Sequence, residues 1–212
     1  ILDEAYYSKK WIYPNTENGF LVHVTISNNY YKGLETICEA LYRIININIG
    51  VNVTLQIAGI KKSDSIYKIV KKMMGNKFPD SNIVTLGHLN SEQLVDNLCK
   101  AHLFVMPSHI ENNSNSLCEA MKIGMPCIAS NVGGIGSLII NNFDGILFQN
   151  GDSISLAGAI KELLLNKEKL ISISQNAIKS SDEKHDKEKI INNLLAIYNS
   201  IVNDVSNNKN NK

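Results

Sequence analysis

The sequence lacks the features that mark several common classes of protein. Its 212 residues carry 21 basic and 20 acidic side chains, which gives a formal net charge of +1 at pH 7. Nucleic-acid-binding domains concentrate positive charge, so this balance argues against nucleic acid as a partner and gives little support for electrostatic membrane binding. No hydrophobic run is long enough for a transmembrane helix, and no stretch has the pattern of a signal peptide.

Cysteine is scarce, and its spacing argues against the usual zinc and redox motifs. The four cysteines form no CxxC pair and no zinc-ligand spacing. Three of them, Cys99, Cys118 and Cys127, lie in apolar patterns, and the fourth is Cys38. Apolar surroundings favour buried free thiols, which agree with a reducing cytosol.

What the sequence does have is the composition and patterning of an α/β domain. Hydrophobic residues make up 44% and charged residues 19%, and the length is sufficient for one domain with a real core. Short apolar runs alternate with helical patterns, which predicts a doubly wound, Rossmann-like parallel sheet. Strands are expected at residues 20–26, 51–58, 82–86, 103–106, 127–129 and 146–148, and helices at about 34–45, 65–74, 91–99, 116–123, 153–165, 167–180 and 187–202. Ser91 is expected to cap the helix at 91–99.

The two ends of the chain differ in composition from its middle. Residues 1–19 are polar and aromatic and are expected to form a linker that leads into the domain, with Trp11 and Tyr13 packed back onto it. The domain itself is expected over residues 20–202, with no internal repeat or linker. Residues 203–212 are rich in Asn and Lys and are expected to be disordered.

The most informative stretch runs from residue 104 to residue 134 and contains two carboxylates. Glu111 stands in a polar loop after a buried apolar run, and Glu119 stands in the first turns of the next helical pattern. This is the pattern of a strand, a loop and a helix, and carboxylates at the mouth of such a unit can accept hydrogen bonds from sugar hydroxyls. Spacing alone leaves a simpler interpretation open, in which Glu119 only favours the helix dipole and Glu111 is a solvated loop residue.

The same helix start offers groups that bind anions. Asn113, Ser114 and Asn115 are good capping residues, and the amides of Asn115, Ser116 and Leu117 are expected near the mouth. Unpaired N–H groups and the helix dipole favour an anion such as phosphate at this position. A phosphate flanked by hydroxyl-rich groups describes a nucleotide sugar.

The residues around the two carboxylates form a longer motif. It is P-S-x-x-E-(x7)-E-A-M-x-x-G-x-P, followed by residues 128–130 and the pair Gly133–Gly134. This stretch closely resembles the E-x7-E signature of retaining glycosyltransferases of the group 1 class, family 4. A lone E-x7-E would be weak evidence, but the surrounding residues make the resemblance specific.

The resemblance implies a two-domain enzyme of GT-B fold whose C-terminal half binds a nucleotide sugar. The chain matches that half alone, so residues 20–202 are expected to be the nucleotide-sugar-binding domain of a longer protein, and the chain a fragment that lacks the N-terminal acceptor domain. The whole protein would transfer a sugar from a nucleotide-sugar donor, with retention, to a glycan or lipid-linked acceptor held by that missing domain. The resemblance implies no metal and no other cofactor. We expect a cytoplasmic protein, with peripheral association at the inner face of the membrane as an open alternative.

The resemblance also implies roles for matching residues. Glu111 would be the catalytic carboxylate, which orients a donor-sugar hydroxyl and supports the cationic sugar, while Glu119 would hold the ribose. Lys32 would clamp the diphosphate. The turn at Gly59 would lie under the donor, and the turn at His88 would contact the nucleobase through its backbone.

The sequence departs from the family pattern in two places, which keeps alternatives open. The usual Arg before Lys32 is replaced by Ser27 or Asn28, and the Pro-Glu that commonly follows the Gly-Gly pair is replaced by Gly136 and Ser137. A non-catalytic nucleotide-binding or scaffold module of the same fold is therefore one alternative. A GT-B nucleotide-sugar epimerase is another, although the context of the motif argues against it. A metal site at His109 would lack a third ligand at a useful spacing.

Overall fold

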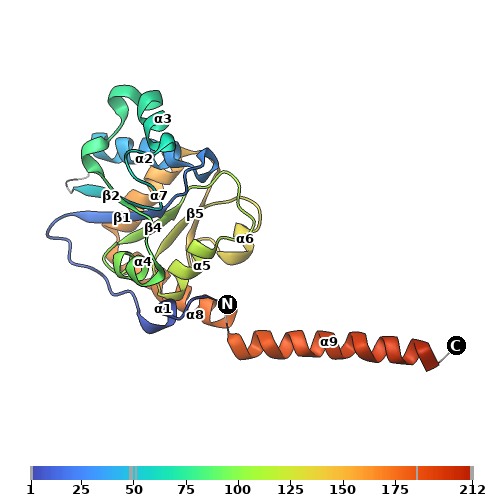
Figure 1. The fold of residues 1–212 in the computed structure, drawn as a ribbon. Coiled ribbons are helices and arrows are strands. Elements are labelled where there is room, and N and C mark those ends of the chain that lie inside the picture. The colour runs from blue at the N-terminus through green and yellow to red at the C-terminus, as the bar shows by residue number, and fades with distance from the viewer. Residues whose placement is uncertain (1, 48–49, 51, 185, 211–212) are drawn as a thin grey trace.

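A six-stranded parallel sheet forms the centre of the computed structural model, which describes residues 2–47, 50, 52–184 and 186–210 (Figure 1). The strands lie in the order β3-β2-β1-β4-β5-β6, and every neighbouring pair is parallel. This arrangement confirms the predicted Rossmann-like sheet. The strands are β1 (Phe20–Thr25), β2 (Val53–Ala58), β3 (Ile83–Gly87), β4 (Leu103–Met106), β5 (Cys127–Ser130) and β6 (Ile146–Phe148).

The central strands are apolar throughout because helices cover both of their faces. All residues of β4 and all residues of β5 are buried. A parallel sheet needs crossover connections, and these place helices on its faces and shield the strands from water. The thiols belong to this interior, since Cys38, Cys118 and Cys127 are buried and Cys99 is half-buried, and all four are free.

The helices form two layers around the sheet (Figure 1). Helices α2 and α3 lie on one side, where α7 packs against α2, and helices α4, α5 and α8 lie on the other. The longer helices are α2 (Leu34–Ile47), α3 (Ser65–Met74), α4 (Ser91–Leu98), α5 (Asn115–Lys122), α7 (Ser153–Leu165) and α8 (Lys167–Lys184). The short ones are η1 (Tyr30–Lys32), η2 (Gly75–Lys77), η3 (Asp80–Asn82) and α6 (Ile135–Leu138).

The cap of α4 differs from the predicted one. We expected Ser91 to cap this helix, but the cap is Asn90, whose side chain accepts a hydrogen bond from the Gln93 amide at 2.9 Å. The Gln93 Oε1 in turn accepts a hydrogen bond from the Asn90 amide at 3.1 Å. Asn90 prevails because only a cap three residues before a Gln can form this reciprocal box.

The N-terminal segment packs onto the domain. It contains a short helix that the sequence did not predict, α1 (Ala5–Ser8), which contacts α4 and α5. Trp11 is buried, its indole Nε1 donates to the Ala101 carbonyl at 2.7 Å, and its amide donates to the Ile123 carbonyl. The predicted packing of Trp11 is therefore confirmed, and Tyr13 lies edge-on against it.

The C-terminal helix, α9 (Lys187–Asn210), extends away from the body of the molecule (Figure 1). The sequence predicted disorder over residues 203–212, whereas the helix continues to Asn210 and residues 211–212 lie outside the described range. An Asn- and Lys-rich composition predicts the absence of a packed core, but helical hydrogen bonds can propagate from an existing turn without one. Among the helices of the described residues, none has the length and apolarity needed to span a bilayer.

Candidate functional site

Strands β1 and β4 lie side by side at the centre of the sheet, and the chain leaves them in opposite directions. From β1 it passes through α2 to β2, and from β4 it passes through α5 to β5 on the other side. Ligands of open α/β sheets bind beyond the carboxyl ends of the strands, at such a switch point. The segment after β1 carries Lys32 and the loop after β4 carries Glu111, so two predicted site residues meet here.

Lys32 and Glu111 form an ion pair, which we call the switch-point pair. The Lys32 Nζ lies 2.7 Å from the Glu111 Oε2, and the two side chains are only 24% and 16% exposed. Partial burial reduces the screening that weakens surface ion pairs. Each residue thus neutralises the charge of the other. An anion that binds Lys32 must compete with the Glu111 carboxylate for its ammonium group.

The Gly133–Gly134 pair packs directly against the loop that carries Glu111. A Cβ atom at Gly133 would lie 1.9 Å from the Glu111 carbonyl oxygen, and one at Gly134 would lie 2.1 Å from that of Asn112. Gly133 also has a φ of +49°, which side chains rarely allow. The two glycines therefore let the loop after β5 support the Glu111 loop, a role that the motif match alone did not reveal.

The N-terminus of α5 lies next to this loop. Ser114 caps the helix, and its Oγ accepts a hydrogen bond from the Leu117 amide at 3.3 Å. The cap therefore uses the Leu117 amide, which the sequence also placed near the mouth, and a role for this amide in binding stays a prediction. The amides of Asn115 and Ser116 have no acceptor within the described part of the chain, so both remain available to an anion.

Gly59 and His88 lie where β2 and β3 end. The Gly59 amide donates to the Gly87 carbonyl at 2.7 Å. A Cβ atom at Gly59 would lie 2.4 Å from the Ile26 carbonyl oxygen, and the φ of this residue is +95°. The turns after β1, β2 and β3 therefore pack closely at one edge, where the His88 side chain is exposed.

Glu119 lies one turn into α5, beneath α1. Burial raises the pKa of its carboxyl group, and a hydrogen bond from the Tyr6 hydroxyl acts in the opposite direction. Tyr6 also interacts with Ser91 at the start of α4, close to the His88 turn. Glu119 therefore lies on the side of the sheet edge near the end of β3, whereas Glu111 lies beside Lys32. The sequence carried no signal for the role of Tyr6.

The side chains at the position of the missing Arg are bonded elsewhere. The Asn28 Oδ1 accepts hydrogen bonds from the Ser65 Oγ at 3.0 Å and the Ile66 amide at 3.1 Å, so it stabilises the start of α3. The Ser27 Oγ accepts from the Asn29 Nδ2 at 3.4 Å. Neither residue supplies a positive charge, so the cation contributed by this segment is Lys32.

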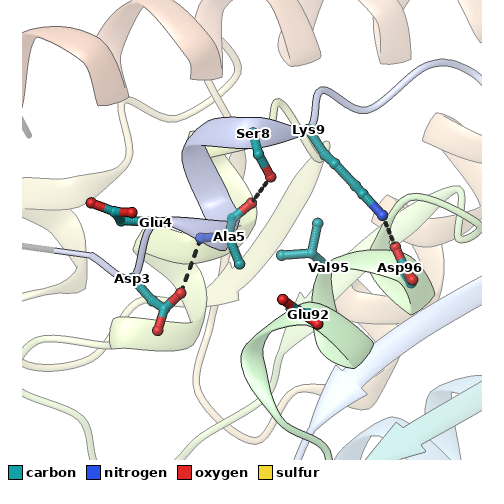
Figure 2. Close-up of a pocket in the computed structure, with 8 residues that line it drawn as sticks. All are labelled: Asp3, Glu4, Ala5, Ser8, Lys9, Glu92, Val95 and Asp96. Carbon is teal, nitrogen blue, oxygen red and sulfur yellow. Dashed lines mark hydrogen bonds and ion pairs between the residues drawn. The ribbon is translucent and has the colours of Figure 1, made fainter.

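A separate pocket lies between α1 and α4 (Figure 2). Its lining is Asp3, Glu4, Ala5, Ser8, Lys9, Glu92, Val95 and Asp96. Four of these side chains are carboxylates, and Lys9 is already paired with Asp96, so the pocket would repel a diphosphate. None of the predicted site residues lines it. In the part of the chain that the structure describes, no group of three or more His, Cys, Asp or Glu side chains is arranged to hold a metal ion.

Comparison with known proteins points to one family. Residues 9–180 match the model of the family described as glycosyl transferases group 1. Over 137 residues the chain is 29% identical to a glycogen synthase of Mycobacterium tuberculosis, a match that covers 64% of this chain and 31% of that protein. The chain spans less than half the length of the curated relatives it matches.

Solved structures share the fold. HepE from Anabaena, in complex with UDP, superposes with a TM-score of 0.76 at 21% identity, over 87% of this chain and 50% of that one. The C-terminal domain of a group 1 glycosyl transferase, LpcC from Francisella tularensis, gives a TM-score of 0.68 at 18% identity, over 82% of this chain and 95% of that one. The fold is the Rossmann-like half of a GT-B glycosyltransferase. Since the family model covers most of the chain, the chain belongs to the group 1 family of glycosyl transferases.

Proposed function

We propose that this chain binds the donor of a retaining glycosyltransferase, which transfers a sugar from a nucleotide sugar to a glycan or lipid-linked acceptor. The observation that carries this proposal is the switch-point pair beside the open N-terminus of α5. A cation, a carboxylate and two free amides at one edge suit a ligand that has both phosphates and hydroxyls. The UDP complex of the similar HepE structure supports a nucleotide as that ligand.

The diphosphate is assigned to Lys32 and the α5 N-terminus. The ammonium group and the amides of Asn115 and Ser116 are donors, and the helix dipole adds partial positive charge. When the bond between the sugar and the diphosphate breaks, negative charge grows on the leaving group. Donors that already point to this position stabilise that charge without reorganising, which lowers the barrier.

The sugar and the ribose are assigned to the two carboxylates. A phosphate that draws Lys32 away leaves the Glu111 carboxylate free to accept a hydrogen bond from a donor-sugar hydroxyl. The same negative charge supports the oxocarbenium character of the sugar in the transition state. Glu119, near the β3 turn, is assigned to the ribose hydroxyls, for which Tyr6 is a competing partner.

The acceptor is assigned to a part of the protein beyond this chain, because the curated relatives are more than twice as long as their match to it. The chain alone should therefore bind a nucleoside diphosphate weakly and transfer nothing. Measurable sugar transfer by the isolated 212-residue chain would contradict this assignment.

The test of the proposed function is a transfer assay with a longer protein that contains this chain and its acceptor-binding part. UDP- and GDP-sugars are supplied with glycan and lipid-linked acceptors, and the anomeric configuration of the product is determined by NMR. An α-linked product from an α-configured donor supports the proposal. An inverted product, or no transfer from any donor, contradicts it.

A non-catalytic nucleotide-binding or scaffold module is the second candidate. It is favoured by the engagement of Asn28 with α3 and by the neutralisation of Lys32 by Glu111, which together leave a weak phosphate clamp. Such a module either binds UDP or GDP or has lost the ability to bind both nucleotides. In either case the longer protein transfers no sugar. Conversion of one nucleotide sugar into its epimer without an acceptor would instead indicate an epimerase.

A further inference from the structure

His109 connects three segments at the edge of the proposed donor site. Its backbone amide donates to the Tyr31 carbonyl at 2.7 Å, next to Lys32. Its ring Nε2 contacts the Glu35 carboxylate in the first turn of α2. Its ring Nδ1 lies 2.7 Å from the Oδ1 of Asn150, in the segment that leads to α7. One side chain thus joins the β4–α5 loop to α2 and to the segment after β6.

The geometry around the ring is that of a protonated imidazole. The Asn150 Nδ2 donates to the His109 carbonyl at 3.3 Å, which orients the amide so that its Oδ1 faces the ring. Both ring nitrogens of His109 therefore face acceptors, the other being the Glu35 carboxylate. A neutral imidazole has one N–H and can satisfy only one of them, whereas an imidazolium satisfies both.

The surrounding charges favour the same state. Partial burial would lower the pKa of His109, but the hydrogen bonds to Glu35 and Asn150 and the Glu35 charge together raise it. The other charged groups on these elements near the ring are the switch-point pair, Glu39 and Arg43 of α2, and Asp152 at the start of α7. Glu39 and Arg43 are both bonded to the Ser153 hydroxyl, at 2.9 Å and 3.3 Å. The Asp152 carboxylate accepts hydrogen bonds from the amides of Ile154 and Ser155, so it is engaged with its own helix.

We propose that protonated His109 is a positioning residue that holds the Glu111 loop against the segment of Lys32, so that a diphosphate binds more weakly once His109 loses its proton. This inference rests on the proposed donor site. Deprotonation leaves one ring nitrogen facing an acceptor with no hydrogen between them, so either the contact with α2 or the contact with Asn150 is released. By linkage, a bound diphosphate in turn strengthens the hold of His109 on its proton.

The experiment is a calorimetric titration of UDP into the 212-residue chain from about pH 6 to about pH 9, across the range in which His titrates. The wild-type affinity should fall about two- to tenfold as the pH rises, the range for one hydrogen bond. His109→Gln should keep the weaker affinity at every pH, apart from the pH dependence that arises when the terminal phosphate of UDP itself titrates at about pH 6. Glu35→Gln should move the midpoint to lower pH, because it removes the anion that favours the imidazolium.

Two controls separate positioning from a general structural effect. Glu162→Gln removes an exposed carboxylate that pairs with Lys169 at 2.6 Å, and it should follow the wild type at every pH. The ring signals of His109 in NMR should titrate at higher pH in the UDP complex than in the free chain. A merely structural role would change the affinity equally at every pH and would leave this shift absent.

The outcomes distinguish the two proposals. Binding of UDP with the same pH dependence in the wild type and in His109→Gln, or a His109 titration that UDP does not move, overturns the positioning role alone. No binding of UDP or GDP by the wild type at any pH overturns the donor site and, with it, the role of His109.

Discussion

The two carboxylates of the motif stand in opposite surroundings, although only seven residues separate them. Glu111 is held by a cation, Lys32, at the junction of β1 and β4. Burial raises the pKa of the Glu119 carboxyl group, and the nearby Tyr6 hydroxyl acts in the opposite direction. The same residue type is thus paired with a cation at one position and desolvated at the other, where the charge of Asp3 raises its pKa further.

This difference divides the edge of the sheet into two regions. The region at β1 and β4 contains the switch-point pair and the free amides of α5, and the region toward β3 contains Glu119, Tyr6 and Ser91. A nucleotide has the matching asymmetry, since its diphosphate is charged and its ribose is neutral. The arrangement therefore supports one orientation of the donor, with the diphosphate toward Lys32 and the nucleoside toward β3.

The largest expected effect comes from removing the charge of Glu111. Glu111→Gln should reduce sugar transfer by the longer protein about 10²- to 10³-fold, the range for loss of one group that stabilises transition-state charge. The same change frees Lys32, so the affinity of this chain for UDP should stay constant or rise. Rate assays and calorimetry check both parts, with Glu162→Gln as the matched control. A wild-type rate, or a loss of UDP affinity, would assign Glu111 to another role.

A smaller effect is expected at Glu119, on binding. Glu119→Ala should weaken UDP binding at least about tenfold, because a hydrogen bond to a charged group is worth roughly 1.5–3 kcal/mol. Calorimetry measures the affinity, and a melting curve shows whether the domain remains folded. Unchanged affinity with an intact melting curve would mean that Glu119 only supports the packing of α1.

Lys32 should have a salt-dependent effect. Lys32→Ala should weaken UDP binding about fivefold at low salt, the scale of a partly screened charge pair, and should remove much of the salt dependence, since screening acts over about 8 Å at physiological ionic strength. Restoring the missing guanidinium with Ser27→Arg should raise the affinity for UDP more than that for uridine. Titrations at two salt concentrations measure these changes. The assignment of Lys32 is wrong if Lys32→Ala binds UDP as well as the wild type at low salt.

The smallest effect is expected at Tyr6 and concerns stability. The pKa of Glu119 is raised, so its contribution to stability is present below the ordinary Glu range and is lost as the pH rises through the raised value. The Tyr6 hydroxyl lowers that pKa, so Tyr6→Phe should raise it further and increase the loss, by about 0.5–1.5 kcal/mol. Melting temperatures between about pH 4 and pH 8 measure it, with Tyr13→Phe as control. Parallel curves for Tyr6→Phe and the wild type would refute the contact.

Local patterns in the sequence predicted most of the fold. The bounds of β4, β6, α3 and α7 agree with those predicted, because each is an apolar or amphipathic run with clear breakers beside it. The one-turn helices α1 and α6 were not predicted, since four residues are too few to show a helical period. The predicted cap of α4 was wrong by one residue. Ser and Asn are both good caps, and the choice between them depends on Gln93.

The site was predictable as a set of loops but not as a set of contacts. Parallel strands place the loops of Lys32 and Glu111 at one edge, and this follows from the alternation of strands and helices. The contact between their side chains joins residues 79 positions apart and depends on β1 and β4 being neighbours, which local patterns do not specify. The same holds for Tyr6 and Glu119, since nothing in residues 1–19 indicates that Tyr6 packs against α5.

The most direct test of the donor-binding account is a calorimetric titration of the wild-type chain with UDP, GDP, uridine and guanosine at low salt. The account predicts that at least one diphosphate binds more tightly than its own nucleoside, because the switch-point pair and the α5 amides act on the phosphates. Equal affinity for a diphosphate and its nucleoside, or no binding of either diphosphate, would contradict it.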